Sequence, residues 1–260
     1  MEHQGVTAMN KRRASLGIML VGALFVVLPG GRATGNTAAT PEARDGRFHQ
    51  SYVERARQGG IDLLFIGDSI TQYWTDRSPA RGGLPVWQRE FEPLRAANFG
   101  VNGERTQHIL WRLQNGEGEG YRPKAVVLLA GTNNTGREKG GSGLRNTAPE
   151  IVDGIVAIVT ELRGRFPEAR ILLLGLLPRW PAGSDYRKQI EEVNRRLPAI
   201  GGDGQVVYID CGAPFLLPDG EVDRRLMPDG IHPNAAGYEI LTAAIKAALG
   251  DTLKLEESNI

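Results

Sequence analysis

Three side chains in this sequence have the chemistry of an ester-cleaving centre: Ser69, His232 and Asp229. Ester cleavage through a covalent intermediate needs a hydroxyl nucleophile, a base that takes its proton, and a group that fixes the tautomer of that base. Ser69 supplies the hydroxyl and His232 the imidazole. Asp229 lies three residues before His232, so it can turn back on the same loop and accept the proton on the other ring nitrogen. We therefore predict these three as catalytic residues.

Donors for the negative charge that develops on the substrate oxygen are also present. We predict an oxyanion hole made of the backbone N–H of Ser69, the backbone N–H of Gly100 and the side-chain amide of Asn133. Glycine at position 100 is the residue type that a close approach of backbone to substrate requires. Losing one such donor typically adds about 3 kcal/mol to the activation barrier.

Each segment has a simpler structural interpretation when taken alone. Gly67-Asp68-Ser69 after a strand is commonly a turn and helix cap, and Asn133 can satisfy backbone groups in a loop. Asp229-x-x-His232 before a proline can begin a helix. Four segments with complementary chemistry, each beside a strand end or a helix start, favour catalysis over chance.

The elements that must position these residues alternate along the chain. Short apolar runs predict five strands, at about residues 61–67, 96–100, 124–131, 169–177 and 205–210. Helices are expected near residues 50–57, 86–91, 106–113 (capped by Thr106), 148–165, 185–197 and 233–249. This alternation indicates a single doubly wound α/β domain with a parallel sheet of about five strands, covered on both faces. The segments that contain Ser69, Gly100 and Asn133 would then converge at one edge of the sheet.

The length, net charge and cysteine content of the chain exclude several classes of protein. The 260 residues suit one large α/β domain, and a net charge of +1 gives no sign of a nucleic-acid partner. No cluster of oxygen ligands accompanies Asp68, so we predict neither a metal nor a cofactor. Cys211 is the single cysteine, which excludes an internal disulfide and is expected to be a buried thiol.

The first 35 residues have the order of a signal peptide. Lys11-Arg12-Arg13 precedes an apolar run over 16–28, and small residues follow. That run is shorter than the ~20 residues of a bilayer span, although an uncleaved N-terminal anchor is the alternative. We predict a signal peptide over 1–35, a linker over 36–50 and the catalytic domain over 51–260. The mature protein is expected to be exported, periplasmic or extracellular, without a stable membrane span.

The candidate segments resemble the sequence blocks of the SGNH/GDSL hydrolase family across residues 60–248. Ser69, Gly100, Asn133 and His232 fall on the four residues that give this family its name, and Asp229 falls on the third member of its triad. The resemblance implies a flavodoxin-like, three-layer fold and hydrolysis of carboxylic esters without a metal.

Further motifs narrow the resemblance. Asn102-Gly103 and the runs 109–116 and 175–179 look like the catalytic subunits of platelet-activating factor acetylhydrolase and their bacterial relatives, whereas the glycine-rich stretch 135–147 departs from them. The α/β-hydrolase fold is excluded because its serine lies in Gly-x-Ser-x-Gly, whereas residues 67–71 read Gly-Asp-Ser-Ile-Thr.

We therefore predict an exported serine esterase for short-chain, O-acetyl esters, whose substrate is a small molecule, carbohydrate or lipid. A lysophospholipase or thioesterase, an acyltransferase with the same triad, and a non-catalytic carbohydrate-binding relative are the alternatives. Trp74 and Trp180 could stack on a sugar or pack under loops, and Arg179 could meet a charged substrate group or lie in solvent. His108 is expected at the surface.

Overall fold

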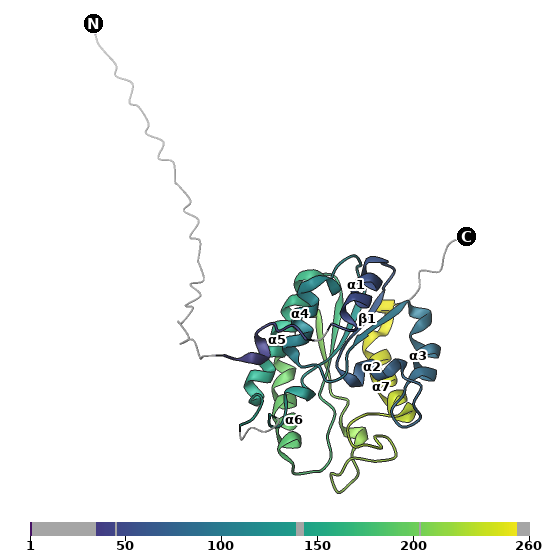
Figure 1. Ribbon diagram of the computed structural model, residues 1–260. Coiled ribbons are helices and arrows are strands. Elements are labelled where there is room, and N and C mark those ends of the chain that lie inside the picture. Colours follow the sequence, from purple (N-terminus) through teal and green to yellow (C-terminus); the bar gives the residue numbers. More distant parts are fainter. Residues whose placement is uncertain (2–34, 45, 139–142, 203, 254–260) are drawn as a thin grey trace. The chain divides into compact units, whose positions relative to one another are not determined.

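A computed structural model describes Met1 and residues 35–44, 46–138, 143–202 and 204–253 (Figure 1). Its five strands are β1 (Leu63–Gly67), β2 (Ala96–Gly100), β3 (Ala125–Leu129), β4 (Arg170–Leu174) and β5 (Val206–Ile209). All neighbours pair in parallel in the order β2-β1-β3-β4-β5. This is the flavodoxin-like order, so the predicted fold class is confirmed.

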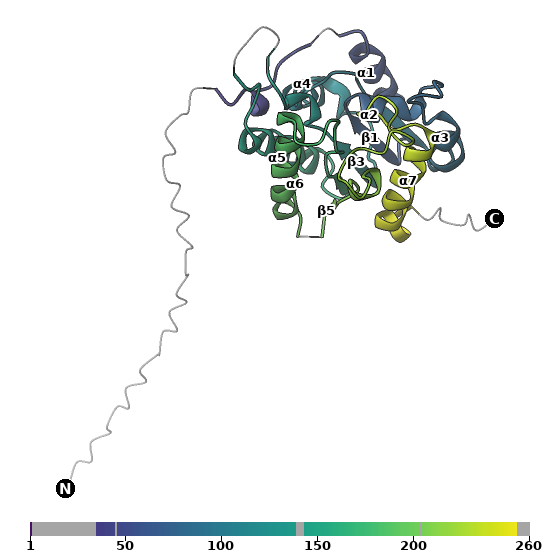
Figure 2. The ribbon, with the colours of Figure 1, turned by 90° about the horizontal axis from the view of Figure 1, so that it is seen from below.

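Helices cover both faces of the sheet. They are α1 (His49–Arg57), α2 (Ser69–Gln72), α3 (Leu84–Glu90), α4 (Thr106–Arg112), α5 (Ala148–Arg165), α6 (Asp185–Arg196) and α7 (Ala235–Leu249). Helices α1, α4, α5 and α6 pack on one face, and α2, α3 and α7 on the other (Figures 1 and 2). Among the described helices, none is both long and apolar enough to cross a membrane.

Burial on both faces explains why the strands are apolar throughout. In β1, Leu64 and Ile66 face the core under α4 and α5, while Leu63 and Phe65 face the core under α3 and α7. Helix α5 begins at a capping box in which Thr147 and Glu150 bond reciprocally to each other's backbone N–H. The two layers of helices therefore follow directly from the alternation of apolar strands and amphipathic helices.

The predicted linker over 36–50 is packed on the domain instead. A short 3₁₀ turn, η1 (Thr37–Ala39), lies against α5, and Ala38 is fully buried. The carbonyl of Ala38 accepts a hydrogen bond from Thr106 Oγ1 at 2.7 Å, so Thr106 braces this segment and does not cap α4. Helix α1 begins at His49, inside the predicted linker. The predicted signal peptide lies outside the described residues, apart from Met1 and Gly35.

The register of the sheet brings three strand ends to the same level. Gly67 at the end of β1 pairs with Gly100 of β2 and with Leu129 of β3. The chain passes from β1 to β2 on one side and then from β2 to β3 on the other side of β1, and flavodoxin-like sheets bind their ligands at this switch point. The loops after β1, β2 and β3 therefore meet at one edge of the sheet.

Candidate active site

Ser69 is held at the start of α2 by the sharp turn after β1. The carboxylate of Asp68 caps the helix by accepting the N–H of Ile70 at 2.9 Å. Gly67 permits the turn, because a Cβ there would lie 2.2 Å from the Leu129 carbonyl oxygen. Ser69 is the first helical residue, so its N–H has no partner within the helix. The turn thus presents both a hydroxyl and a free backbone donor.

His232 joins Ser69 to Asp229 in a continuous line of hydrogen bonds. Ser69 Oγ lies 2.9 Å from His232 Nε2, and His232 Nδ1 lies 2.6 Å from Asp229 Oδ2. The ring of Tyr73 packs against the imidazole, with 4.9 Å between the centroids. The structure therefore places all three predicted catalytic side chains in the order that proton transfer requires.

The loop before α7 fixes the orientation of Asp229. Its Oδ1 accepts the backbone N–H of Ile231 at 2.9 Å and of His232 at 2.7 Å, while Gly230 takes a positive φ of 79°. Partial burial raises the pKa of Asp229, but the hydrogen bonds from His232 and from these amides outweigh it, so the pKa is lowered. The lowered pKa favours the carboxylate form of Asp229, which accepts a hydrogen bond from Nδ1–H.

Asn133 follows β3 in a 3₁₀ turn, η5 (Thr132–Asn134). Its side-chain amide donates to the carbonyl of Glu104 at 2.9 Å, which uses one of two N–H groups and ties the loop after β3 to the loop after β2. The next residue, Asn134, is fully buried and accepts the N–H of Thr106 at 3.0 Å. Asn134 was not among the predicted site residues, although the doubled asparagine indicates that both positions matter.

The predicted role of Gly100 is wrong in this geometry. Its N–H donates to Asn98 Oδ1 at 2.9 Å, so it is already occupied. Glycine is required there because a Cβ would lie 2.2 Å from the backbone N of Gln72 in α2. The close backbone approach inferred from the sequence is real, but the partner is the helix that carries Ser69 and not a substrate.

Gly103 offers the donor that Gly100 does not. It has a positive φ of 76°, and its N–H makes no hydrogen bond within the described part of the chain. The preceding N–H, of Asn102, donates to Gln72 Oε1 at 2.8 Å, which ties this loop to α2. An Asn-Gly pair after a strand is a turn signal with positive φ, so this position could have been found from the sequence.

A buried ionic network holds the loop after β2 that contains Gly103 and Glu104. Arg112 Nε donates to Glu104 at 2.8 Å, Nη1 donates to Glu117, and Nη2 donates to the carbonyl of Phe99 at 3.0 Å. Glu117 also bonds His49 Nδ1 at 2.8 Å. Burial raises the pKa of Glu104 and of Glu117, and the charge of Arg112 opposes that rise. The network connects α4 to the residue whose carbonyl holds Asn133.

Other predicted residues have varied outcomes. Trp74 is 3% exposed and packs against Phe65, so it belongs to the core, whereas Trp180 is 52% exposed. His108 is buried, contrary to prediction, and its Nδ1 accepts the N–H of Arg105 at 3.1 Å. Cys211 is buried as expected, which raises the pKa of its thiol to about 12.

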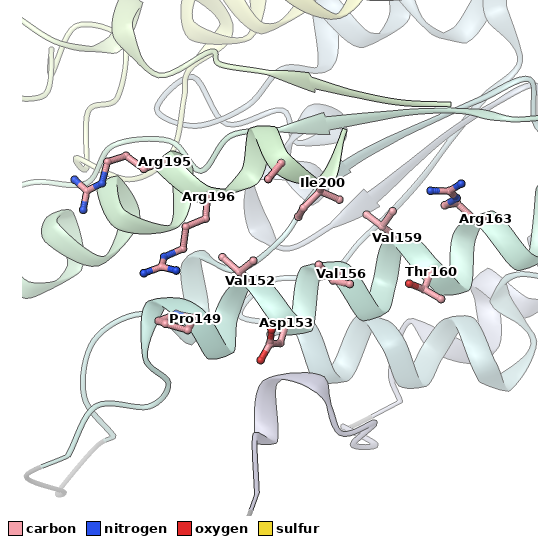
Figure 3. Close-up of a pocket in the computed structure, with 11 residues that line it drawn as sticks. Pro149, Val152, Asp153, Val156, Val159, Thr160, Arg163, Arg195, Arg196 and Ile200 are labelled. Carbon is pink, nitrogen blue, oxygen red and sulfur yellow. The ribbon is translucent and has the colours of Figure 1, made fainter. Parts of the chain in front are cut away.

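A metal-binding cluster and other cavities were the remaining candidates for a functional site. In the part of the chain that the structure describes, no group of three or more histidine, cysteine or carboxylate side chains could hold a metal ion. A groove of about 610 Å³ between α5 and α6 is lined by residues such as Val152, Val156 and Arg196 (Figure 3). It contains none of the predicted site residues.

A flavodoxin-like sheet with a Ser–His–Asp line at the carboxyl ends of its strands defines a serine hydrolase. The sequence model of the GDSL-like lipase/acylhydrolase family matches residues 65–240. The chain belongs to this family, and it is a carboxylic ester hydrolase.

Two similar proteins are subunits of platelet-activating factor acetylhydrolase IB. Human platelet-activating factor acetylhydrolase IB subunit alpha1 is 35% identical over 209 residues, covering 79% of this chain and 84% of that protein. The rat alpha2 subunit is also 35% identical, over 212 residues, covering 78% of this chain and 86% of its own. The expected resemblance to these subunits is confirmed.

Solved structures share the fold at lower identity. A GDSL-like lipase from Bacteroides thetaiotaomicron has a TM-score of 0.61 and 19% identity, covering 80% of this chain and 97% of that one. An acetylxylan esterase from Geobacillus stearothermophilus has a TM-score of 0.56 and 21% identity, covering 74% and 95%. At this level of identity the likeness concerns the fold.

Proposed function

We propose that this esterase cleaves short-chain, O-acetyl esters through an acyl-enzyme on Ser69. The observation that carries the proposal is the unbroken line from Ser69 Oγ through His232 to Asp229, at 2.9 and 2.6 Å. A hydroxyl that is hydrogen-bonded to an oriented imidazole is an activated nucleophile.

The chemistry proceeds in two halves. Ser69 Oγ attacks the carbonyl carbon while its proton passes to His232 Nε2, and Asp229 stabilises the imidazolium through Nδ1–H. Collapse of the tetrahedral intermediate breaks the ester bond, and His232 returns the proton to the leaving alcohol. Water then repeats the sequence on the acyl-enzyme and releases the carboxylic acid and free Ser69.

Three donors would stabilise the oxyanion. They are the N–H of Ser69, the second amide hydrogen of Asn133 and the N–H of Gly103, which takes the place predicted for Gly100. The hydrogen bond from Asn133 to the Glu104 carbonyl at 2.9 Å supports this set, because it fixes the amide beside the Gly103 loop. Donors that are already oriented need no reorganisation as the charge develops.

The acyl group is proposed to be small. Ser69 is 3% exposed, which is consistent with a narrow approach to its hydroxyl. The curated relatives at 35% identity are acetylhydrolases by name, which supports the same acyl group here. A lysophospholipase or thioesterase, and an acyltransferase with the same triad, remain the competing proposals.

Replacement of the nucleophile tests the mechanism. Ser69→Ala should abolish hydrolysis of p-nitrophenyl acetate while the thermal melt stays unchanged. Ser51→Ala is the matched control, since Ser51 is exposed on α1 and bonds only the carbonyl of Phe48. Activity retained in Ser69→Ala would defeat the assignment.

Two further assays address the substrate. A series of p-nitrophenyl esters of increasing length should show the highest kcat/KM for acetate, whereas a maximum at long chains would favour a lysophospholipase. An added alcohol distinguishes the transferase, since acyl transfer outrunning hydrolysis would contradict a hydrolase.

We also propose that the protein is exported, on the basis of the basic triplet Lys11-Arg12-Arg13 and the apolar run 16–28. Protein recovered outside the cytoplasm should begin close to residue 36 when its N-terminus is sequenced. A full-length chain found only inside the cell would contradict export.

A further inference from the structure

Arg179 has an unusual environment for a guanidinium. It follows β4, is only partly exposed, and lies over the ring of Tyr186 at 4.4 Å. Within the described residues its guanidinium makes no hydrogen bond and no ion pair, and its Nε is fully buried. Burial lowers the pKa of Arg179. A cation that is withdrawn from water normally has a partner, because removing it from water is costly.

Arg112 and Arg187, the two arginines that are buried in the described part of the chain, follow that rule. Arg112 is bonded to two carboxylates and a carbonyl. Arg187 donates to Glu191 at 3.1 Å and to two backbone carbonyls, including that of Arg179. Among the described residues, both of these guanidinium groups are therefore hydrogen-bonded, whereas that of Arg179 contacts the ring of Tyr186 and makes no hydrogen bond.

The position of Arg179 points to the active site. The next residue, Trp180, donates its N–H to the carbonyl of Gly230 at 3.0 Å, which ties this loop to the loop of Asp229 and His232. Asp68 and Asp229 are the carboxylates that act on Arg179 electrostatically, yet neither lies within 4 Å of it. Arg145, which also acts on Arg179 electrostatically, donates to the carbonyl of Asn133 at 3.0 Å.

We propose that Arg179 binds a carboxylate carried by the ester substrate itself, so that the preferred substrates are acidic esters. This inference rests on the proposed function, because it places the anion beside the bond that Ser69 attacks. A guanidinium presents a planar fork of donors that matches a carboxylate in two parallel hydrogen bonds. Trp180, the next residue in the chain, has an exposed ring that offers a surface for an apolar or sugar ring of the same substrate.

The carboxylate could belong to the alcohol part or to the acyl part, and paired substrates distinguish them. The alcohol arm compares 4-acetoxybenzoate with methyl 4-acetoxybenzoate. The acyl arm compares 4-nitrophenyl hydrogen succinate with 4-nitrophenyl methyl succinate. In the wild-type enzyme we expect kcat/KM to be higher for the anion in one of the two arms.

Variants of Arg179 assign the preference to this residue. Arg179→Gln should lower kcat/KM for the preferred anion by about 10- to 100-fold, the usual range for a charge-assisted hydrogen bond, and change the neutral ester less than twofold. Arg179→Lys should retain part of the preference, because it keeps the charge without the fork. Arg196→Gln is the matched control, since Arg196 is 49% exposed and pairs with Glu192 on α6, away from the predicted site residues.

The outcomes separate this inference from the proposed function. If neither arm shows a preference for the anion in the wild type, or if Arg179→Gln lowers both members of a pair equally, the inference is overturned. Hydrolysis of p-nitrophenyl acetate that depends on Ser69 would still stand in either case. Should Arg179→Gln fail to fold, the wild-type comparison and Arg179→Lys decide the question.

Discussion

Replacing Arg112 with methionine should destabilise the protein strongly. Arg112 is the only cation in contact with both Glu104 and Glu117 among the described residues, and all three side chains are at most 4% exposed. Methionine keeps most of the volume but removes the charge and all five donors. Two carboxylates would then be buried without a guanidinium between them, and the ring of His49 would remain at 2.8 Å from Glu117.

The size of the effect follows from the burial. Breaking a buried ion pair by removing one partner costs about 3–5 kcal/mol, a large share of the 5–15 kcal/mol that typically stabilises a domain. For a domain of this size the melting temperature should fall by about 6–20 °C. Activity should fall as well, because the carbonyl of Glu104 holds the amide of Asn133.

Urea unfolding and thermal melts would measure the loss. Arg196→Met is the matched control, because Arg196 pairs with Glu192 at 2.8 Å but is 49% exposed, and such a pair contributes at most about 1 kcal/mol (Figure 3). The loss of unfolding free energy in Arg112→Met should be smaller at pH 5 than at pH 8, because protonation of Glu104 and Glu117 removes the unpaired buried charge.

A compensated variant sharpens this test. Arg112→Met combined with Glu104→Gln and Glu117→Gln should be more stable than Arg112→Met alone, because no unpaired charge remains. An Arg112→Met protein within 1 kcal/mol of the wild type, or a triple variant no better than the single one, would refute the reasoning.

Two other substitutions test local features. Gly100→Ala should lower the free energy of unfolding in urea by about 3 kcal/mol, because its Cβ would lie 2.2 Å from Gln72 N. Gly164→Ala on α5 is the control: its Cβ would have no atom within 4 Å, so it should stabilise the protein by about 0.5–1 kcal/mol. Equal effects would contradict the packing role of Gly100. Burial raises the pKa of Asp68 from its ordinary value of 3.8 to about 7. Between those values the unfolded chain binds fewer protons, so the free energy of unfolding should fall as pH rises, by up to about 4 kcal/mol, and Asp68→Asn should flatten that slope. An unchanged slope would show that Asp68 does not cause it.

The sheet and most of the helices could be predicted because their signals are local. Helix α5 has the predicted bounds, 148–165, since a capping box marks its start and its buried face is regular. The last helix begins at Ala235 and not at 233, because Asn234 is its cap. Residues 36–44 could not be placed, since a polar segment that packs through backbone hydrogen bonds leaves no apolar pattern.

The site was predictable to the extent that its chemistry lies in single segments. Ser69 and the Asp229–His232 loop are recognisable because each carries its own reactive group. Gly100 and Gly103 are both compatible with a free donor in the sequence, and only the hydrogen bond from Gly100 to Asn98 separates them. His108 sits among charged residues that suggest a surface, yet two of them, Glu104 and Arg112, pair with each other inside the protein.

Unpaired polar atoms are concentrated at the edge of the sheet that carries the site. Five buried side-chain atoms lack a hydrogen-bond partner among the described residues, and four of them belong to Asp68, Thr132, Arg145 and Arg179. Asp68, Thr132 and Arg179 follow β1, β3 and β4, and Arg145 bonds the residue after Thr132. Folding alone would favour pairing each of these groups, since an unsatisfied buried polar atom is costly. Because these unpaired groups lie at the edge of the sheet that carries Ser69, hydrogen-bonding groups are available there for a substrate. Such groups can stabilise charge without rearrangement.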